Sequence, residues 1–223
     1  MGRLARIKPA GQIYSVVTRV NNCNFAFADH AVCTAFLRHI KDIKKELGFK
    51  LYAFVIMSTH VHLLIEPDEA IADISEIMRR INGLFARKYN AFHKRKGHFW
   101  MQRFSSKLVE PGQYFANTII YFALNPVKAG ITDNPLKYEH SSIHNITSGR
   151  FADLLDTLPQ IYVEHIENFL RRKNFVEILQ KYKRILRQFS FQLRKTAYEQ
   201  KFRYFIGSKQ FYKQNILCCV QSC

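Results

Sequence analysis

The sequence predicts an α+β fold in which helices pack against one face of an antiparallel sheet. Segments with strand and helix character follow one another in the order strand, helix, strand, strand, helix, strand, helix. Only Ser58-Thr59 separates the second and third strands, which indicates an antiparallel hairpin. Nearly half of the 223 residues are apolar, so the chain can bury a sizeable core.

The first half of the chain begins with a strand over residues 13–20, where β-branched residues predominate. A helix is expected over 30–47, because its apolar residues recur at helical spacing between Lys and Arg residues. Gly48 then supplies a stop signal. The apolar runs 51–57 and 60–67 form the two strands of the hairpin.

A second long helix is expected over residues 73–93, and a basic run, HKRKG, closes it. Residues 98–110 have the character of extended or hairpin structure. A third helix is expected over about 113–124. It should end before the Asn125-Pro126 step, because the residue before a proline disfavours the α conformation.

The chain changes character after about residue 150, which predicts a division into two parts. Residues 1–150 hold the mixed strands and helices and form the predicted catalytic domain. Residues 151–223 form a predicted helical extension with 13 Lys and Arg against 6 Asp and Glu, including a long basic amphipathic run. We expect this extension to bind DNA.

The charge of the whole chain predicts a polyanionic partner. Lys and Arg number 34 against 17 Asp and Glu, a formal net charge of +17. No segment has the run of about 20 apolar residues that spans a bilayer, and the first residues lack the apolar core of a secretory signal. Five cysteines without CxxC spacing suggest a reducing compartment. These features together predict a cytoplasmic protein that binds nucleic acid.

A pair of histidines, His60 and His62, is the most informative local feature. Side chains two apart in a strand point to the same face, so the two imidazoles can hold one divalent ion. Exposed or hydrogen-bonded histidines are the ordinary alternative for this spacing. The apolar strand around them favours the metal, because two adjacent polar groups in such a strand are costly without a partner.

The third predicted helix carries a candidate nucleophile, Tyr121. A tyrosine can attack a phosphodiester and store the bond as a phosphotyrosine. Asn125 lies four residues later on the same helical face, and its amide oxygen is a possible metal ligand. A core tyrosine on an amphipathic helix is the ordinary alternative. Tyr114, seven residues earlier on roughly the same face, is the rival nucleophile.

Four motifs, MSTHVHLLIEP, GHFWMQRFSS, YFALNPVKAG and NPLKYEHSS, together resemble the HUH single-tyrosine transposases. Within that family they are most similar to the REP-associated tyrosine transposases. The similarity runs from about Tyr14 to Ser142, and FIGSKQFYKQN at 205–215 resembles the family's tail more loosely. The resemblance implies a ferredoxin- or RRM-like HUH fold and a nuclease that cuts and rejoins single-stranded DNA bearing hairpins.

The same resemblance implies a role for each candidate residue. His60 and His62 match the HUH pair and would bind Mg²⁺ or Mn²⁺, and Asn125 stands where relatives complete the metal site with Gln or Asn. Tyr121 matches the nucleophile, which takes the 5′-phosphate until a new 3′-OH reverses the reaction. Departures occur in the first strand and at Glu139-His140, where relatives commonly have Pro-Trp. They concern DNA contacts more than chemistry.

Basic and aromatic side chains supply the expected DNA contacts, because cations neutralise phosphates and rings stack on unpaired bases. A solvated surface is the ordinary alternative for any single cation, but the cluster around HKRKGHFWMQRFSSK favours binding. The candidates are Arg19, Arg79, Arg80, Arg87, Lys88, Lys94, Arg95, Lys96, Trp100, Arg103 and Lys107.

Three other functions are compatible with parts of the sequence. The fold could persist as a domesticated, non-cleaving nucleic-acid-binding protein, although such a protein has no need of His60, His62 and Tyr121 together. A replication initiator or relaxase usually carries a helicase or accessory domain. A two-metal hydrolase needs more carboxylates than Glu66, which shares the histidines' face and is a possible supporting partner. The charge and periodicity leave monomer and homodimer equally open.

Overall fold

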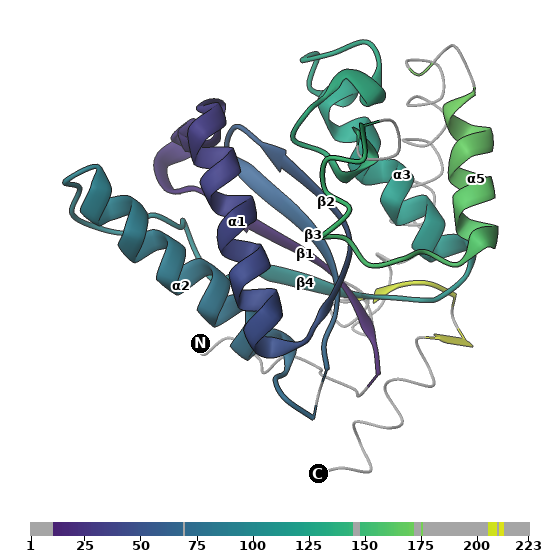
Figure 1. Cartoon of the computed structure of the whole chain (residues 1–223), viewed down its shortest axis with the longest axis horizontal. Coiled ribbons are helices and arrows are strands. Elements are labelled where there is room, and N and C mark those ends of the chain that lie inside the picture. Colours follow the sequence, from purple (N-terminus) through teal and green to yellow (C-terminus); the bar gives the residue numbers. More distant parts are fainter. Residues whose placement is uncertain are drawn as a thin grey trace, which may run out of the picture.

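The computed structural model describes residues 11–68, 70–144, 148–171, 175, 205–208 and 210–211. One five-stranded sheet lies at its centre (Figure 1). Its strands, in order across the sheet, are β2 (Lys50–Met57), β3 (His60–Glu66), β1 (Ile13–Arg19), β4 (Ser105–Val109) and β5 (Phe205–Ile206). β2, β3, β1 and β4 are antiparallel, and the short β5 is parallel to β4. The predicted α+β class is confirmed.

Helices cover both faces of the sheet (Figure 1). α1 (His30–Leu47) and α2 (Ile74–Phe92) lie on one face, and α3 (Gln113–Lys128) and α5 (Gln160–Leu170) lie on the other. The prediction that all helices pack against one face is therefore wrong for the helices after β4. The physical reason is that β2 and β3 are apolar on both faces, and each apolar face must be buried.

Short 3-10 turns connect these elements. They are η1 (Asn21–Cys23), η2 (Ala26–Ala28), η3 (Pro135–Lys137) and η4 (Ser142–His144). η1 begins two residues after the last residue of β1.

The core between the sheet and α1/α2 is rich in aromatic rings. Phe36 of α1 is fully buried, and its ring lies 4.7 Å from that of Phe85 of α2, measured between centroids. Phe27 and Phe99 join the same cluster from the connecting segments. Large buried rings of this kind dominate core energetics, so this face fixes the position of both helices on the sheet.

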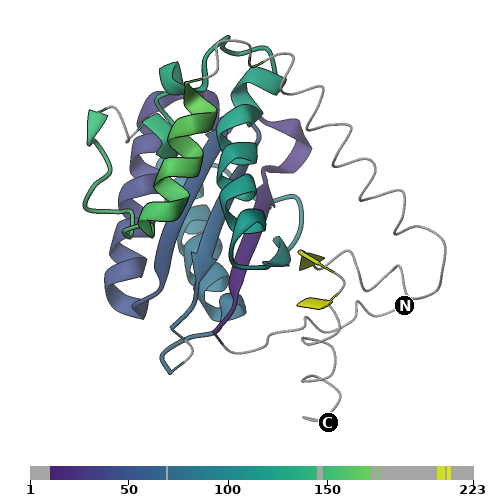
Figure 2. The same ribbon diagram turned by 90° about the vertical axis from the view of Figure 1, so that its right-hand side faces the viewer.

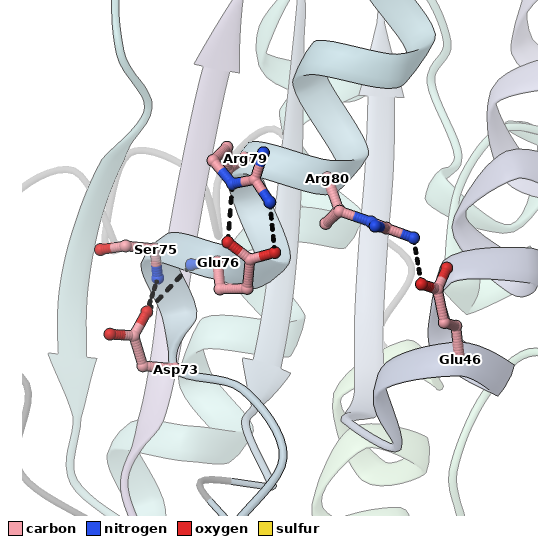
Figure 3. A network of polar contacts seen from close by, with 6 residues as sticks. All are labelled: Glu46, Asp73, Ser75, Glu76, Arg79 and Arg80. Carbon is pink, nitrogen blue, oxygen red and sulfur yellow. Dashed lines mark hydrogen bonds and ion pairs between the residues drawn. The ribbon is translucent and has the colours of Figure 1, made fainter.

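Side-chain caps define the ends of α1 and α2. The carboxylate of Asp29 accepts the backbone N–H of Ala31, and Gly48 ends α1 in a left-handed conformation with φ of 67°. The Asp73 carboxylate caps α2 by accepting the N–H groups of Ser75 and Glu76 (Figure 3). Gly48 is the stop signal that the sequence marks, and Asp73 is the first residue of the helix predicted over 73–93.

α3 continues through Pro126 to Lys128, two residues beyond the proline. The prediction that it ends at Leu124 is wrong. Pro126 lacks an N–H donor, but the remaining turn closes with Ala129 N–H donating to the Asn125 carbonyl at 3.0 Å. Leu124, Pro126 and Val127 are buried, so apolar packing holds this last turn in place.

Residues after 150 add to the same structure. Phe151 and Leu154 join the α1/α2 core, while α5 packs against α3 through Ile166 and Phe169. β5 extends the sheet beyond β4. Most of the long basic run from residue 166 to 189 lies outside the described residues, so the division at residue 150 and the DNA-binding role of 151–223 stay predictions. No helix among the described residues is both long and apolar enough to cross a membrane.

Candidate active site

His60 and His62 lie on β3 and face the layer that contains α3. Strand alternation directs Val61, Leu63 and Ile65 into the α1/α2 core, and the two histidines therefore point to the opposite face. Their ring centroids are 5.1 Å apart. The structure thus brings the two imidazoles side by side, as the spacing predicts.

Burial keeps both imidazoles neutral. It lowers the pKa of His60 from 6.5 to about 4, and the positive charges of Arg19 and Lys128 contribute. It lowers the pKa of His62 to about 3, with contributions from His60, Arg19 and Lys128. Neutral imidazoles have the free lone pair that metal binding requires.

The hydrogen bonds of the pair leave nitrogen atoms available. Nδ1 of His60 lies 3.0 Å from the Thr59 hydroxyl, which can fix the ring orientation. Nδ1 of His62 is buried and has no hydrogen-bond partner among the described residues. A buried polar atom without a partner is costly, and a bound ligand would offset that cost.

Tyr121 of α3 lies beside this pair. Its ring centroid is 6.2 Å from that of His62 in an edge-to-face arrangement, and Phe122 packs against His62 at 5.2 Å. Burial raises the pKa of the Tyr121 phenol, while the nearby Arg19 opposes that rise. Tyr114 lies two helical turns earlier, near the Glu110 carboxylate that helps to raise its own pKa. Of the two candidate nucleophiles, Tyr121 is the one that contacts His62.

Asn125 is buried one turn after Tyr121. Its side-chain amide donates to the Tyr121 carbonyl at 2.8 Å, which ties the two residues together on one helical face. The amide oxygen accepts no hydrogen bond from the described residues. It is therefore available as an acceptor or a ligand.

Lys128 is a residue of this site that the sequence analysis missed. Its Nζ lies 5.8 Å from the centroid of the Tyr121 ring, and its charge acts on both histidines. The available signal was its spacing, because seven residues are close to two helical turns and place Lys128 near Tyr121. Lysines are common in the last turn of a helix, so this spacing alone does not distinguish Lys128 from an ordinary surface lysine.

The donor set fits a divalent ion that takes its remaining ligands from elsewhere. Two neutral imidazoles and a nearby amide oxygen suit an ion of the Mn²⁺ or Mg²⁺ class. Within the described part of the chain, no group of three or more His, Cys, Asp or Glu residues could hold a metal. Glu66 is not a supporting partner, because its carboxylate accepts from Tyr52 at 2.6 Å and from Lys50 at 2.8 Å.

The face of the sheet beside the histidines is open over β1 and β4. Across the sheet, Val55, His62, Val17 and Ser105 form one row, and Arg19 pairs with His60 in the next. Val55 is fully buried beneath the α3 layer, whereas Val17 is half-buried and Ser105 exposed. Figure 2 shows α3 and α5 in front of the sheet. An exposed strip thus runs from the histidines towards Lys107 of β4.

The predicted DNA-binding residues separate into four groups. Arg19 and Lys107 line the exposed strip. Arg79 and Arg80 of α2 are engaged with Glu76 and Glu46 (Figure 3). A third group of exposed cations lies on the last turns of α2 and on the loop after it, a part of the chain that projects from the body in Figure 1. These residues are Arg87, Lys88, Lys94, Lys96 and Arg103.

The side chains of Arg95 and Trp100 form the fourth group, and both make contacts within the protein. The Arg95 guanidinium lies 5.7 Å from the Tyr89 ring centroid. The Trp100 indole N–H donates to the Asn82 carbonyl at 2.8 Å, and its half-buried ring packs against Phe99. Only the exposed part of Trp100 is available to a base.

Comparisons with known proteins identify a family and a fold for this chain. A transposase family described as IS200-like matches residues 10–121, half of the chain. A solved structure of a REP-associated tyrosine transposase bound to a REP hairpin aligns with a TM-score of 0.57 and 19% identity, covering 71% of this chain and 93% of that one. A structure from Deinococcus radiodurans R1, assigned as a transposase, aligns with a TM-score of 0.39 and 18% identity, covering 56% of this chain and 95% of that one. No curated protein matches the chain.

Proposed function

The chain belongs to the IS200-like transposase family, and from this premise we propose that it cuts and rejoins single-stranded DNA with Tyr121 as the nucleophile. The contact between Tyr121 and His62, with ring centroids 6.2 Å apart, is the observation that supports this most strongly. It joins a nucleophile on α3 to a neutral histidine pair on β3, two elements that are far apart in sequence.

In the proposed reaction, the Tyr121 phenol loses its proton to solvent and its oxygen attacks the scissile phosphorus. The bond from phosphorus to the 3′-oxygen breaks, and that oxygen takes up a proton to leave as a 3′-hydroxyl. The 5′-phosphate stays bonded to Tyr121. Attack by another 3′-hydroxyl reverses these steps and rejoins the strand without loss of bond energy.

His60 and His62 would hold a Mg²⁺ or Mn²⁺ ion, and Asn125 offers an amide oxygen as a further ligand. Such an ion polarises the phosphate and stabilises charge on the departing oxygen. The hydrogen bond from Asn125 to the Tyr121 carbonyl links the orientation of that ligand to the helix that carries the nucleophile.

The substrate that we propose is single-stranded DNA next to a hairpin. The exposed strip over β1 and β4 leads to the histidines, and Arg19 and Lys107 on it can neutralise phosphates. The projecting cations after α2 and the basic segment 151–223 would add affinity. The structural neighbour bound to a REP hairpin shares this fold, which supports a hairpin as the recognised element.

A gel assay for a covalent protein–DNA adduct tests this proposal. The full-length protein would be mixed with end-labelled single strands carrying hairpins from the DNA that flanks its own gene, with Mn²⁺ or Mg²⁺. We expect an adduct that requires the metal and that chelation prevents. Tight hairpin binding without an adduct in either metal would contradict the proposal and identify a non-cleaving binding protein.

A further inference from the structure

Two cations, Arg19 and Lys128, flank the histidine pair. Arg19 lies opposite His60 in the register between β1 and β3, and Lys128 lies over the Tyr121 ring from the last turn of α3. Both side chains are exposed, and neither forms an ion pair with any residue that the structure describes.

The site has no described negative charge to balance these cations. The two imidazoles are neutral, and Glu66 on the same strand is taken up by Lys50 and Tyr52. A divalent ion that binds the histidines therefore meets repulsion from Arg19 and Lys128. At separations of several ångströms and the water-like dielectric around exposed side chains, that repulsion weakens cation binding by roughly three- to ten-fold per neighbouring charge.

A phosphate reverses this balance. Its negative charge interacts favourably with Arg19, Lys128 and the metal alike, and its oxygens are ligands that Mg²⁺ and Mn²⁺ accept. We propose that Arg19 and Lys128 bind the scissile phosphate and thereby make metal binding depend on DNA binding. This inference rests on the proposed function, and it adds Lys128 to the residues that contact the substrate.

The dependence runs in both directions, because coupling between two ligands is reciprocal. DNA increases the affinity for the metal, and the metal increases the affinity for DNA by the same factor. An unloaded protein would bind the ion weakly, so the chemistry starts only when a phosphate is in place.

The ordinary role of Lys128 would be a cation near a helix C-terminus, where it interacts with the helix dipole. Lys45 provides a matched control for that role, because it is also an exposed lysine in the last turn of a helix, α1. α1 lies on the opposite face of the sheet from the histidines. Replacing either lysine by Gln would remove its interaction with a helix dipole, whereas only the replacement of Lys128 should change the metal affinity.

The test is Mn²⁺ binding followed by electron paramagnetic resonance at low salt, a measurement that does not depend on turnover. The full chain with Tyr121→Phe would be titrated with Mn²⁺ alone and with saturating hairpin-bearing single strand. We expect DNA to raise the Mn²⁺ affinity by at least about ten-fold. In the absence of DNA, the double variant Arg19→Gln/Lys128→Gln should bind Mn²⁺ roughly 10- to 100-fold more tightly, and the increase in Mn²⁺ affinity that DNA causes should become smaller.

Lys45→Gln should leave both affinities unchanged, and Lys128→Arg should restore the coupling because it keeps the charge. Equal Mn²⁺ affinity with and without bound DNA would overturn the inference, as would a lower affinity of the double variant without DNA. Either result is compatible with formation of the covalent DNA adduct by the wild-type protein, so the proposed function would hold without this inference. Absence of any wild-type adduct would instead refute the proposed function.

Discussion

The two faces of the sheet differ sharply in composition, although the same strands build both. The face against α1 and α2 is a continuous apolar core with stacked aromatic rings. The face towards α3 is apolar only beneath the helix, and over β1 and β4 it exposes Arg19, Ser105 and Lys107. β3 contributes Val61 to the first face and His62 to the second.

This difference separates stability from chemistry within one sheet. A fully covered face can hold the backbone in place, so the opposite face can keep neutral histidines and unpaired cations that would destabilise a core. The four predictions below test that separation, and the first three each include a matched control residue.

The largest effect is expected for the nucleophile. Tyr121→Phe removes only the phenol oxygen, so adduct formation should fall by at least about 1,000-fold while hairpin binding changes little. Tyr114→Phe, the same change two turns earlier in α3, should leave adduct formation close to wild type. The gel assay measures both, and an adduct that survives Tyr121→Phe but disappears in Tyr114→Phe would reverse the assignment.

The next effect concerns the covered face. Phe36→Ala empties a fully buried ring position in α1 and should lower the free energy of unfolding by about 3–5 kcal/mol. Val17→Ala, on the exposed strip, should cost about 1 kcal/mol or less, because the side chain is only half-buried. Urea denaturation followed by circular dichroism measures both. Equal decreases in the free energy of unfolding would show that the two faces contribute equally to stability, contrary to this prediction.

A smaller effect is expected for metal affinity. His62→Ala removes a proposed ligand, and its effect is measured in the Tyr121→Phe protein with DNA bound. Loss of a residue that only supports a ligand weakens metal binding by roughly 10- to 100-fold, and we expect His62→Ala to weaken Mn²⁺ binding by more than that. His39→Gln is the control, since His39 is also a buried histidine but lies between α1 and α2. Undiminished Mn²⁺ binding in His62→Ala would refute the ligand assignment.

The smallest effect is the pH dependence that His39 causes. Burial lowers the pKa of His39 below its ordinary 6.5, while its Nε2 lies 3.0 Å from the Ile81 carbonyl. The unfolded chain takes up this proton first, so stability is complete above pH 6.5 and falls as the pH drops below it. The slope is at most about 1.4 kcal/mol per pH unit for this proton.

His39→Gln keeps a hydrogen-bond donor without titrating, so its unfolding free energy should fall less between pH 7 and pH 5 than that of the wild type. Urea titrations of both proteins at the two pH values measure the difference. Parallel losses in the two proteins would mean that His39 keeps its ordinary pKa in the folded state.

Much of the fold could be predicted because the relevant signals are local. The helix expected over 30–47 has the bounds of α1, and the hairpin strands lie within a residue of their expected positions. The end of α3 could not be predicted, because Pro126 is tolerated only where buried packing offsets the lost hydrogen bond. That packing comes from residues distant in the chain.

The candidate site divides in the same way. Spacing alone places His60 beside His62, and Tyr121 on one face with Asn125, because strand and helix periodicity are local properties. The sequence also determined the α+β class, and its charge predicts a polyanionic partner. Only the tertiary structure brought Tyr121 of α3 to His62 of β3, and it committed Arg80, Trp100 and Glu66 to other contacts. The physical reason is that a side chain's partners depend on which elements pack together, and that is decided by burial on both faces of the sheet.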